Sequence, residues 1–214
     1  KHFNSSLIKP ILETAWPFGL MGMMGAIMLN TDIVMLGSMR TPSDVGYYSA
    51  AQKIILLLYI APSLLASSTF PALSRFAKIN TTAANQILRK SIKIMLLIAF
   101  PISILGIILA NTILTILFSS AYSEATVTFQ ILLLSLIFVF PGTLLGNALF
   151  AYDAQKYFLR FVIISTVLNA SLNYPLIKSF GIEGAALSTV ITQLITNTLL
   201  FIKVRKITGL KIFN

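Results

Sequence analysis

Long apolar runs alternate with short polar stretches along the whole 214-residue chain. A bilayer core about 30 Å thick takes roughly 20 apolar residues of helix to cross, and six runs are long enough. They predict helices at about residues 8–39, 45–76, 84–110, 124–152, 156–177 and 181–205. Residues 111–119 are predicted to be a short amphipathic piece lying along the membrane interface. The pattern therefore predicts an all-α membrane protein, with one lobe formed by a bundle of six transmembrane helices.

Four prolines lie well inside the predicted helices, at Pro17, Pro62, Pro101 and Pro141. Because each removes a backbone hydrogen bond, we expect bends at Pro17 and Pro62 and an interruption at Pro141–Gly142. Proline is common in membrane helices generally, but bent helices also occur where transporters place sites or flex. Four of them favour a bundle that moves or lines a cavity.

Composition and charge agree with a membrane location. Hydrophobic residues make up 57% of the chain and charged residues 10%, against roughly 25% charged in ordinary soluble domains. Six crossings put both ends and the even-numbered loops on one face, which receives all the Lys and Arg except Arg40, Lys53 and Lys178. Since cytoplasmic loops carry the excess of Lys and Arg, both ends are predicted to be cytoplasmic. The net charge of +10 then lies at an anionic leaflet, and nucleic acid is not an expected partner.

Two charged residues fall within apolar runs, Asp32 in the first and Lys53 in the second. In a helical hairpin they lie at similar depths, roughly 12 and 11 Å from the turn. An unpaired charge near the bilayer centre costs at least about 2.5 to 3.5 kcal/mol, so we expect both to face the protein interior within ion-pair or water-bridged reach. The pair is a structural clamp, the wall of a substrate or ion pathway, or both. Asn30 and Gln52, beside these charges in the chain, are further candidates for that wall.

Polar side chains are spaced along the last two predicted helices so that they line one face of each. The positions are Ser165, Asn169 and Asn173 in one helix and Thr189, Gln193, Thr196 and Asn197 in the other. They form either interhelical hydrogen bonds, worth on the order of 0.6 kcal/mol each, or a sugar-binding wall. Asn169, Asn173 and Gln193 are accordingly weaker site candidates.

Several kinds of site lack their parts. The chain has no Cys and one His, and His2 lies outside every apolar run, so disulfides, Cys-based metal sites and His-centred triads are excluded. Neither a G-x-x-x-x-G-K-[ST] loop nor a G-x-S-x-G motif occurs. Glu13 is interpreted as a surface partner of Lys9 in preference to a proton-carrying site. We therefore expect no catalytic or metal-binding residues, no cofactor and no enzymatic activity.

Six segments carry a family likeness. They are DIVMLG at 32–37, VGYYSAAQK at 45–53, FPALS at 70–74, LFSSAY at 117–122, NYPLI at 173–177 and GIEGAALST at 181–189. In this order they resemble the second half of polysaccharide (O-antigen or capsule repeat-unit) flippases of the multidrug/oligosaccharidyl-lipid/polysaccharide (MOP) exporter superfamily. The resemblance covers nearly the whole chain. It implies the C-terminal lobe of a MATE-like transporter of twelve or more spans, with an N-terminal lobe missing from this chain and a cavity between the lobes. The start at Lys1 with no Met likewise leads us to expect a piece of a longer protein.

The resemblance also implies a substrate and a location. Members carry lipid-linked oligosaccharides on polyprenyl diphosphate from the cytoplasmic to the outer leaflet, here of a bacterial inner membrane, and Asp32 and Lys53 match charged positions near their cavity. The expected partners are the bilayer, this substrate, the N-terminal lobe and other membrane proteins of polysaccharide assembly. A diphosphate favours several cations, and Lys53 is the only one at depth in this lobe. Either the other lobe carries most of them, or the contacts run through sugar and lipid.

Two alternatives remain open. A drug or cation antiporter of the same superfamily would use Asp32 as its proton or sodium site, and an acid without Lys53 as partner would favour it. A non-transporting membrane scaffold for polymer synthesis would need neither charge.

Overall fold

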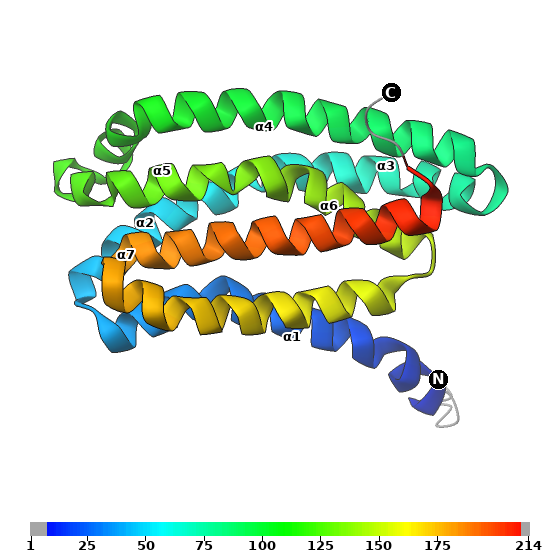
Figure 1. Cartoon of the computed structure of the whole chain (residues 1–214), viewed down its shortest axis with the longest axis horizontal. Coiled ribbons are helices and arrows are strands. Elements are labelled where there is room, and N and C mark those ends of the chain that lie inside the picture. Colours follow the sequence, from blue (N-terminus) through cyan, green and yellow to red (C-terminus); the bar gives the residue numbers. More distant parts are fainter. Residues whose placement is uncertain (1–7, 211–214) are drawn as a thin grey trace, which may run out of the picture.

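The structure is a computed structural model that describes residues 8–210, with the side chains of 8–14, 17, 18 and 21 left out. Its elements are α1 (Ile8–Met39), α2 (Pro42–Leu58), α3 (Ile60–Ile79), α4 (Thr81–Phe118), the 3-10 helix η2 (Ser120–Ala125), α5 (Thr126–Leu134), α6 (Leu136–Ala151) and α7 (Gln155–Thr208). Every element in this range is helical (Figure 1), which confirms the all-α fold class. The bend expected at Pro17 and the contact expected between Glu13 and Lys9 fall on side chains outside the description.

The second predicted helix is broken where a proline interrupts its hydrogen bonds. Pro62 has no N–H to donate to the carbonyl of Leu58. Accordingly α2 ends at Leu58, and α3 begins at Ile60 after the single residue Tyr59. The bend expected from Pro62 is confirmed.

The fourth predicted helix breaks at a different place from the one expected. α5 and α6 meet at Ser135, while Pro141 lies inside α6. Both the N–H and the hydroxyl of Ser135 donate to the carbonyl of Leu132, three residues back, at 3.0 and 2.6 Å. This tightens the turn and ends α5. The interruption expected at Pro141–Gly142 is therefore wrong.

The predicted interfacial piece at 111–119 is also wrong, because these residues continue α4 up to Phe118. Ala110 and Leu114 are fully buried and carry the packing face of the helix past Asn111. Asn111 accepts a hydrogen bond from the hydroxyl of Thr126, at the start of α5, over 3.3 Å. The helix therefore stays in the bundle over its whole length.

α7 is a hairpin of two antiparallel arms, 155–180 and 182–208, that turns at Gly181. This glycine has φ 62° and ψ −134°, a conformation that side chains with a Cβ rarely adopt. The arms lie so close that a Cβ on Gly184 would fall 2.0 Å from the carbonyl oxygen of Leu176. Within residues 8–210, five segments are long and apolar enough to cross a bilayer, and α7 is the last of them. Since each arm is also long enough to cross, the described chain contains six membrane-length rods.

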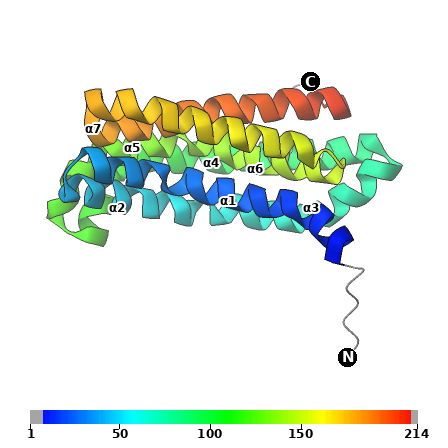
Figure 2. The ribbon, with the colours of Figure 1, turned by 90° about the horizontal axis from the view of Figure 1, so that it is seen from below.

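The rods lie roughly side by side, with their connections gathered at two ends (Figure 1). One end holds the α1–α2 turn, η2 and Gly181. The opposite end holds the α3–α4 and α6–α7 connections and both ends of the described chain. Seen from below, α7 runs along one long side of the lobe and α1, α2 and α3 along the other (Figure 2).

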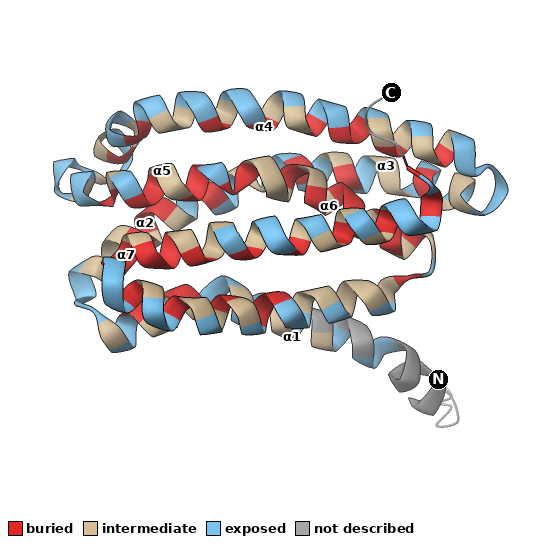
Figure 3. Cartoon of the chain, in the orientation of Figure 1, coloured by how far each residue is buried: buried red, intermediate tan, exposed pale blue. Residues whose placement is uncertain are grey.

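The outward faces of the rods are apolar, as hydrocarbon requires. Leu97, Ile108 and Ile116 of α4 are 71 to 76% exposed, whereas Ala99 and Ser103 of the same helix are buried (Figure 3). A soluble protein rarely exposes so extensive an apolar surface. The pattern therefore fits a helix with small residues against its neighbours and large ones against lipid.

Candidate functional site

Asp32 is buried between α1, α2 and α7 and is held by three hydrogen-bond donors. The side chain is 3% exposed. Its Oδ2 accepts from the hydroxyls of Tyr48 at 2.6 Å and Thr189 at 2.7 Å. Its Oδ1 accepts from Nδ2 of Asn173 at 2.6 Å. One carboxylate thus joins α1, α2 and both arms of α7.

A second layer of polar side chains surrounds this carboxylate. Nδ2 of Asn173 also donates to Oδ1 of Asn169 at 3.2 Å. The hydroxyl of Ser188, in the other arm, donates to the backbone carbonyl of Asn169 at 3.1 Å. Ser165 donates to the sulfur of Met28 at 3.4 Å. The polar stripe of the first arm therefore forms interhelical hydrogen bonds within the lobe.

The predicted pairing of Asp32 with Lys53 inside the lobe is wrong. Lys53 is exposed, and neither ion pair found among the described residues includes it. α2 instead presents Tyr48 to Asp32, and Gln52 lies on the same face one turn later. Lys53 is five residues from Tyr48, which turns it by about 140° around the helix axis. The hairpin predicted how deep Lys53 lies in the membrane, but not the side of α2 from which its side chain projects.

The site also has an unmatched oxygen. Oδ1 of Asn173 is fully buried and has no hydrogen-bond partner. A cavity of about 40 Å³ next to Asp32 is lined in part by Tyr48, Gln52 and Tyr59, and it is large enough for a water molecule or a small ion.

This chemistry limits what the site can hold. In the part of the chain that the structure describes, no three His, Cys, Asp or Glu side chains gather as metal ligands. One carboxylate with neutral oxygens of Asn169, Asn173 and Thr189 supplies a single negative charge. Such a donor set suits a monovalent cation or a proton better than a divalent metal, which usually takes more carboxylates.

The other candidates lie around this cavity or outside it. Gln52 is half-buried, and its Nε2 donates to the carbonyl of Leu29 in α1 at 2.9 Å. Gln193 lines the cavity, and its Oε1 accepts from Asn197 at 3.1 Å. Asn30 is exposed on α1 and bonds only within its own helix, to the carbonyl of Ala26 at 2.8 Å. Asn30 and Lys53 are therefore separate from the buried cluster.

Sequence reasoning missed Tyr48, although it stands within the VGYYSAAQK segment. It is fully buried and lies on the same face of α2 as Ala51 and Ile55, which are also buried. That face is the signal that could have identified it. The same periodicity could have identified Tyr48 as the residue of α2 that faces Asp32.

The two helix breaks meet beside the cavity. Tyr59, which separates α2 from α3, lies 3.3 Å from Ser135, which separates α5 from α6, measured between their hydroxyl oxygens. Tyr59 also lines the cavity next to Asp32. Two helices with locally weakened backbone bonding therefore contact each other at the level of the buried carboxylate.

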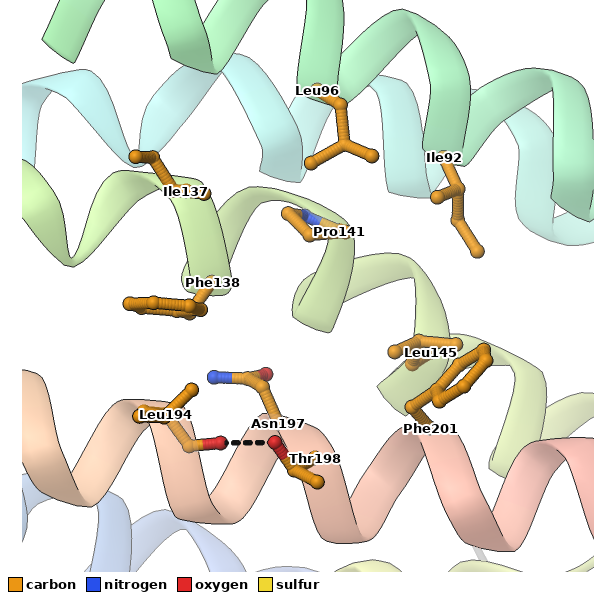
Figure 4. A pocket seen from close by; sticks show the side chains of 10 residues that line it. All are labelled: Ile92, Leu96, Ile137, Phe138, Pro141, Leu145, Leu194, Asn197, Thr198 and Phe201. Carbon is orange, nitrogen blue, oxygen red and sulfur yellow. Dashed lines mark hydrogen bonds between the residues drawn. The ribbon is translucent and has the colours of Figure 1, made fainter. Parts of the chain in front are cut away.

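A larger groove of about 280 Å³ lies elsewhere, between α4, α6 and α7 (Figure 4). Its lining is apolar except for Asn197 and Thr198. Asn197 extends towards α6, where a Cβ on Gly142 would fall 1.6 Å from its Oδ1. The hydroxyl of Thr198 donates to the carbonyl of Leu194 at 2.7 Å. These polar groups serve packing, and no charged side chain lines this groove.

Comparison with known proteins gives matches along the whole chain. Residues 1–214 match the family model described as "Lipid II flippase MurJ". In Haloferax volcanii, "Probable low-salt glycan biosynthesis flippase Agl15" is 29% identical over 169 residues, 78% of this chain and 36% of that protein. "Probable flippase AglR" from the same organism is 29% identical over 168 residues, 76% of this chain and 35% of that protein. "Capsular polysaccharide biosynthesis protein CapF" of Staphylococcus aureus is 23% identical over 199 residues, 91% of this chain and 50% of that protein. The chain thus spans about a third to a half of the length of these relatives.

Proposed function

The chain belongs to the family described as lipid II flippase MurJ, and from this premise we propose that it is the C-terminal lobe of a flippase for lipid-linked oligosaccharides. The names of its relatives support this class of activity. The observation in the chain itself that carries a transport role is Asp32. A carboxylate that is 3% exposed in an apolar lobe, with no cation beside it among the described residues, is costly to maintain and by default indicates function.

The path of the substrate is proposed to follow the side of the lobe formed by α1, α2 and α3. Asn30, Lys53, Ser63 and Ser67 are exposed on these helices. A lysine facing hydrocarbon would be costly, whereas a watery cavity shared with a second lobe would solvate Lys53. We infer that the N-terminal lobe stands opposite this side and that Lys53 contacts the diphosphate of the substrate, as cations do with phosphate oxygens.

Transport of this kind makes and breaks no bond. A ligand shifts the balance between two conformations only by binding one of them more tightly. Asp32 is suited to couple an ion to this balance, because it accepts hydrogen bonds from α2 and from both arms of α7 at once. Neutralising its charge with a monovalent cation or a proton alters all three bonds together. Because Asp32 is buried without Lys53 as a partner, it favours an ion-coupled flippase. The same observation also supports a cation antiporter.

The proposed location is the cytoplasmic membrane of a bacterium, with both ends of this segment in the cytoplasm. The uneven distribution of Lys and Arg supports this orientation. Arg40 and Lys178 lie near the end of the lobe that holds Gly181, whereas Arg75, Lys78 and Arg205 lie near the other. Other membrane proteins of polysaccharide assembly are proposed partners.

The experiment uses the full-length protein in cells that lack their own flippase. We expect Asp32→Asn and Lys53→Ala to abolish or strongly reduce surface polymer at normal protein levels, with lipid-linked units accumulating inside. Lys178→Ala is the matched control, because Lys178 is an exposed lysine near the same end of the lobe as Lys53. It should leave surface polymer unchanged.

The outcomes separate the alternatives. Normal surface polymer in both variants would favour a scaffold, which needs neither charge. Loss of drug or cation export in these variants, with surface polymer intact, would favour an antiporter. Loss of surface polymer in the Lys178→Ala control as well would show that the assay reports general damage.

A further inference from the structure

Three cations surround one tyrosine ring at the open end of the α7 hairpin. Nζ of Lys203 lies 3.4 Å from the centroid of the Tyr157 ring. Nζ of Lys156 and Cζ of Arg160 lie 5.5 and 5.7 Å from the same centroid. Lys203 belongs to the second arm and the other residues to the first. The cluster therefore spans the two arms where they are farthest from Gly181.

Among the side chains that the structure describes, neither ion pair includes a cation of this cluster. The nearest acid along the chain is Asp153, and it pairs with Lys78 at 3.1 Å. The second ion pair found in the described part of the chain joins Arg40 to Asp44, near the other end of the lobe. The aromatic ring attracts the cations but does not cancel their charges. Three like charges around one ring favour an anion between them.

An apolar stripe leads from the cluster into the membrane-spanning part of the first arm. Ile164 and Val167 follow Arg160 by four and seven residues, so they lie on the same helical face. They are 47% and 61% exposed. A cationic cluster at the helix end and an exposed apolar face beyond it match the two parts of a lipid, its charged headgroup and its acyl chain.

We propose that Lys156, Arg160 and Lys203 bind the phosphate of an anionic phospholipid, whose acyl chain lies along Ile164 and Val167. Charge complementarity selects this occupant, because the leaflet facing the basic end of a membrane protein is rich in anionic lipids. The first arm of α7 packs against α1, since the hydroxyl of Thr166 donates to the carbonyl of Met24 at 3.4 Å, so this site borders the proposed path of the transported lipid. Its cations and its apolar stripe are present whatever the lobe transports, so the site does not depend on the proposed function.

Binding is tested by native mass spectrometry of the purified full-length protein with added phosphatidylglycerol, and with phosphatidylcholine of the same acyl chains. The test variant combines Lys156→Gln, Arg160→Gln and Lys203→Gln. Since a basic residue near an anionic surface contributes about fivefold in affinity, we expect the variant to bind phosphatidylglycerol at least about tenfold more weakly. Phosphatidylcholine binding should be weak and unchanged.

The matched control removes three cations from α4 near the same end of the lobe, by Arg89→Gln, Lys90→Gln and Lys93→Gln. It should change phosphatidylglycerol binding by less than about twofold. Should the triple test variant fail to fold, Lys203→Gln alone is expected to weaken binding by about fivefold.

Three results would overturn the proposal. The first is equal weakening in both triple variants, which would indicate a generally basic surface. The second is no preference of the unmodified protein for phosphatidylglycerol over phosphatidylcholine. The third is displacement of phosphatidylglycerol from the cluster by a lower concentration of polyprenyl diphosphate, which would assign the cluster to the transported lipid.

Discussion

Replacing Asp32 by Asn and by Ala separates two contributions to the stability of the protein. One is the cost of burying the charge of Asp32, and the other is the gain from the hydrogen bonds that its carboxylate accepts. The Asn variant removes the charge but keeps an oxygen where the hydroxyls of Tyr48 and Thr189 now donate to Oδ2. Its amide would face Asn173, whose Oδ1 is buried without a partner and could accept a bond if that side chain turned over. The turn would cost Asn173 its bond to Asn169. The Ala variant leaves all three donors without an acceptor.

The magnitudes follow from these contacts. The Asn variant keeps three hydrogen bonds at this position and loses the one between Asn173 and Asn169, a net gain of two over Ala. At about 0.6 kcal/mol each, Ala should be less stable than Asn by about 1 kcal/mol, which for a protein of this size or larger corresponds to roughly 2 to 4 °C or less in Tm. Asn should be at least as stable as the unmodified protein without a bound cation, because an uncompensated charge no longer has to be buried.

The assay is thermal unfolding of the full-length protein in detergent, in sodium chloride and in choline chloride at equal ionic strength. If sodium binds at Asp32, it should stabilise the unmodified protein by about 1.4 kcal/mol at ten times its Kd, and the Asn variant should not respond. The reasoning on hydrogen bonds is refuted if Ala and Asn unfold at the same temperature. An equal sodium response in the Asn variant would refute Asp32 as the sodium site.

Two further predictions concern packing and the helix breaks. Gly184→Ala should destabilise the protein by at least about 1 to 3 kcal/mol, because its Cβ would meet the Leu176 carbonyl. The control Gly46→Ala, which has open space around it, should be neutral or slightly stabilising in the same thermal assay. Equal Tm values for the two variants would contradict the close approach of the arms. A double-mutant cycle of Tyr59→Phe and Ser135→Ala should give a coupling energy of about 0.6 kcal/mol, and a value near zero would show that the contact between the two breaks contributes no stability.

Apolar run length predicted most of the fold but not every helix end. The rods follow directly from runs that exceed the thickness of a bilayer, and the break near Pro62 follows from its missing N–H. The break at Ser135 carries no such signal, because it arises from bonds that any serine in a membrane helix is able to make. Asn111 was read as the end of a helix, but buried Ala110 and Leu114 continue the packing there.

Individual residues of the site could be predicted from the sequence, but most of the contacts between them could not. A carboxylate in an apolar run was enough to single out Asp32, and the spacing of Asn169 and Asn173 placed them on one face. Their meeting could not be predicted, since Asp32 and Asn173 are 141 residues apart in the chain. Lys53 shows the complementary limit, because a hairpin fixes the depth of a residue while each residue turns the helix by about 100°.

The distribution of close packing indicates which parts of the lobe move when Asp32 changes its charge. The arms of α7 are held at backbone contact by Gly184. The first arm is also bonded to Met24 and Met28 of α1, independently of Asp32, so these elements should move as one body. α2 is different, because it is bonded to Asp32 through Tyr48 and ends at the break beside Tyr59. A weaker bond at Tyr48 would free α2 to pivot at this break. The contact between Tyr59 and Ser135 would then pass the movement to the junction of α5 and α6. An ion at Asp32 would thus act on the exposed side of α2 that carries Lys53, with no contact between the two charges.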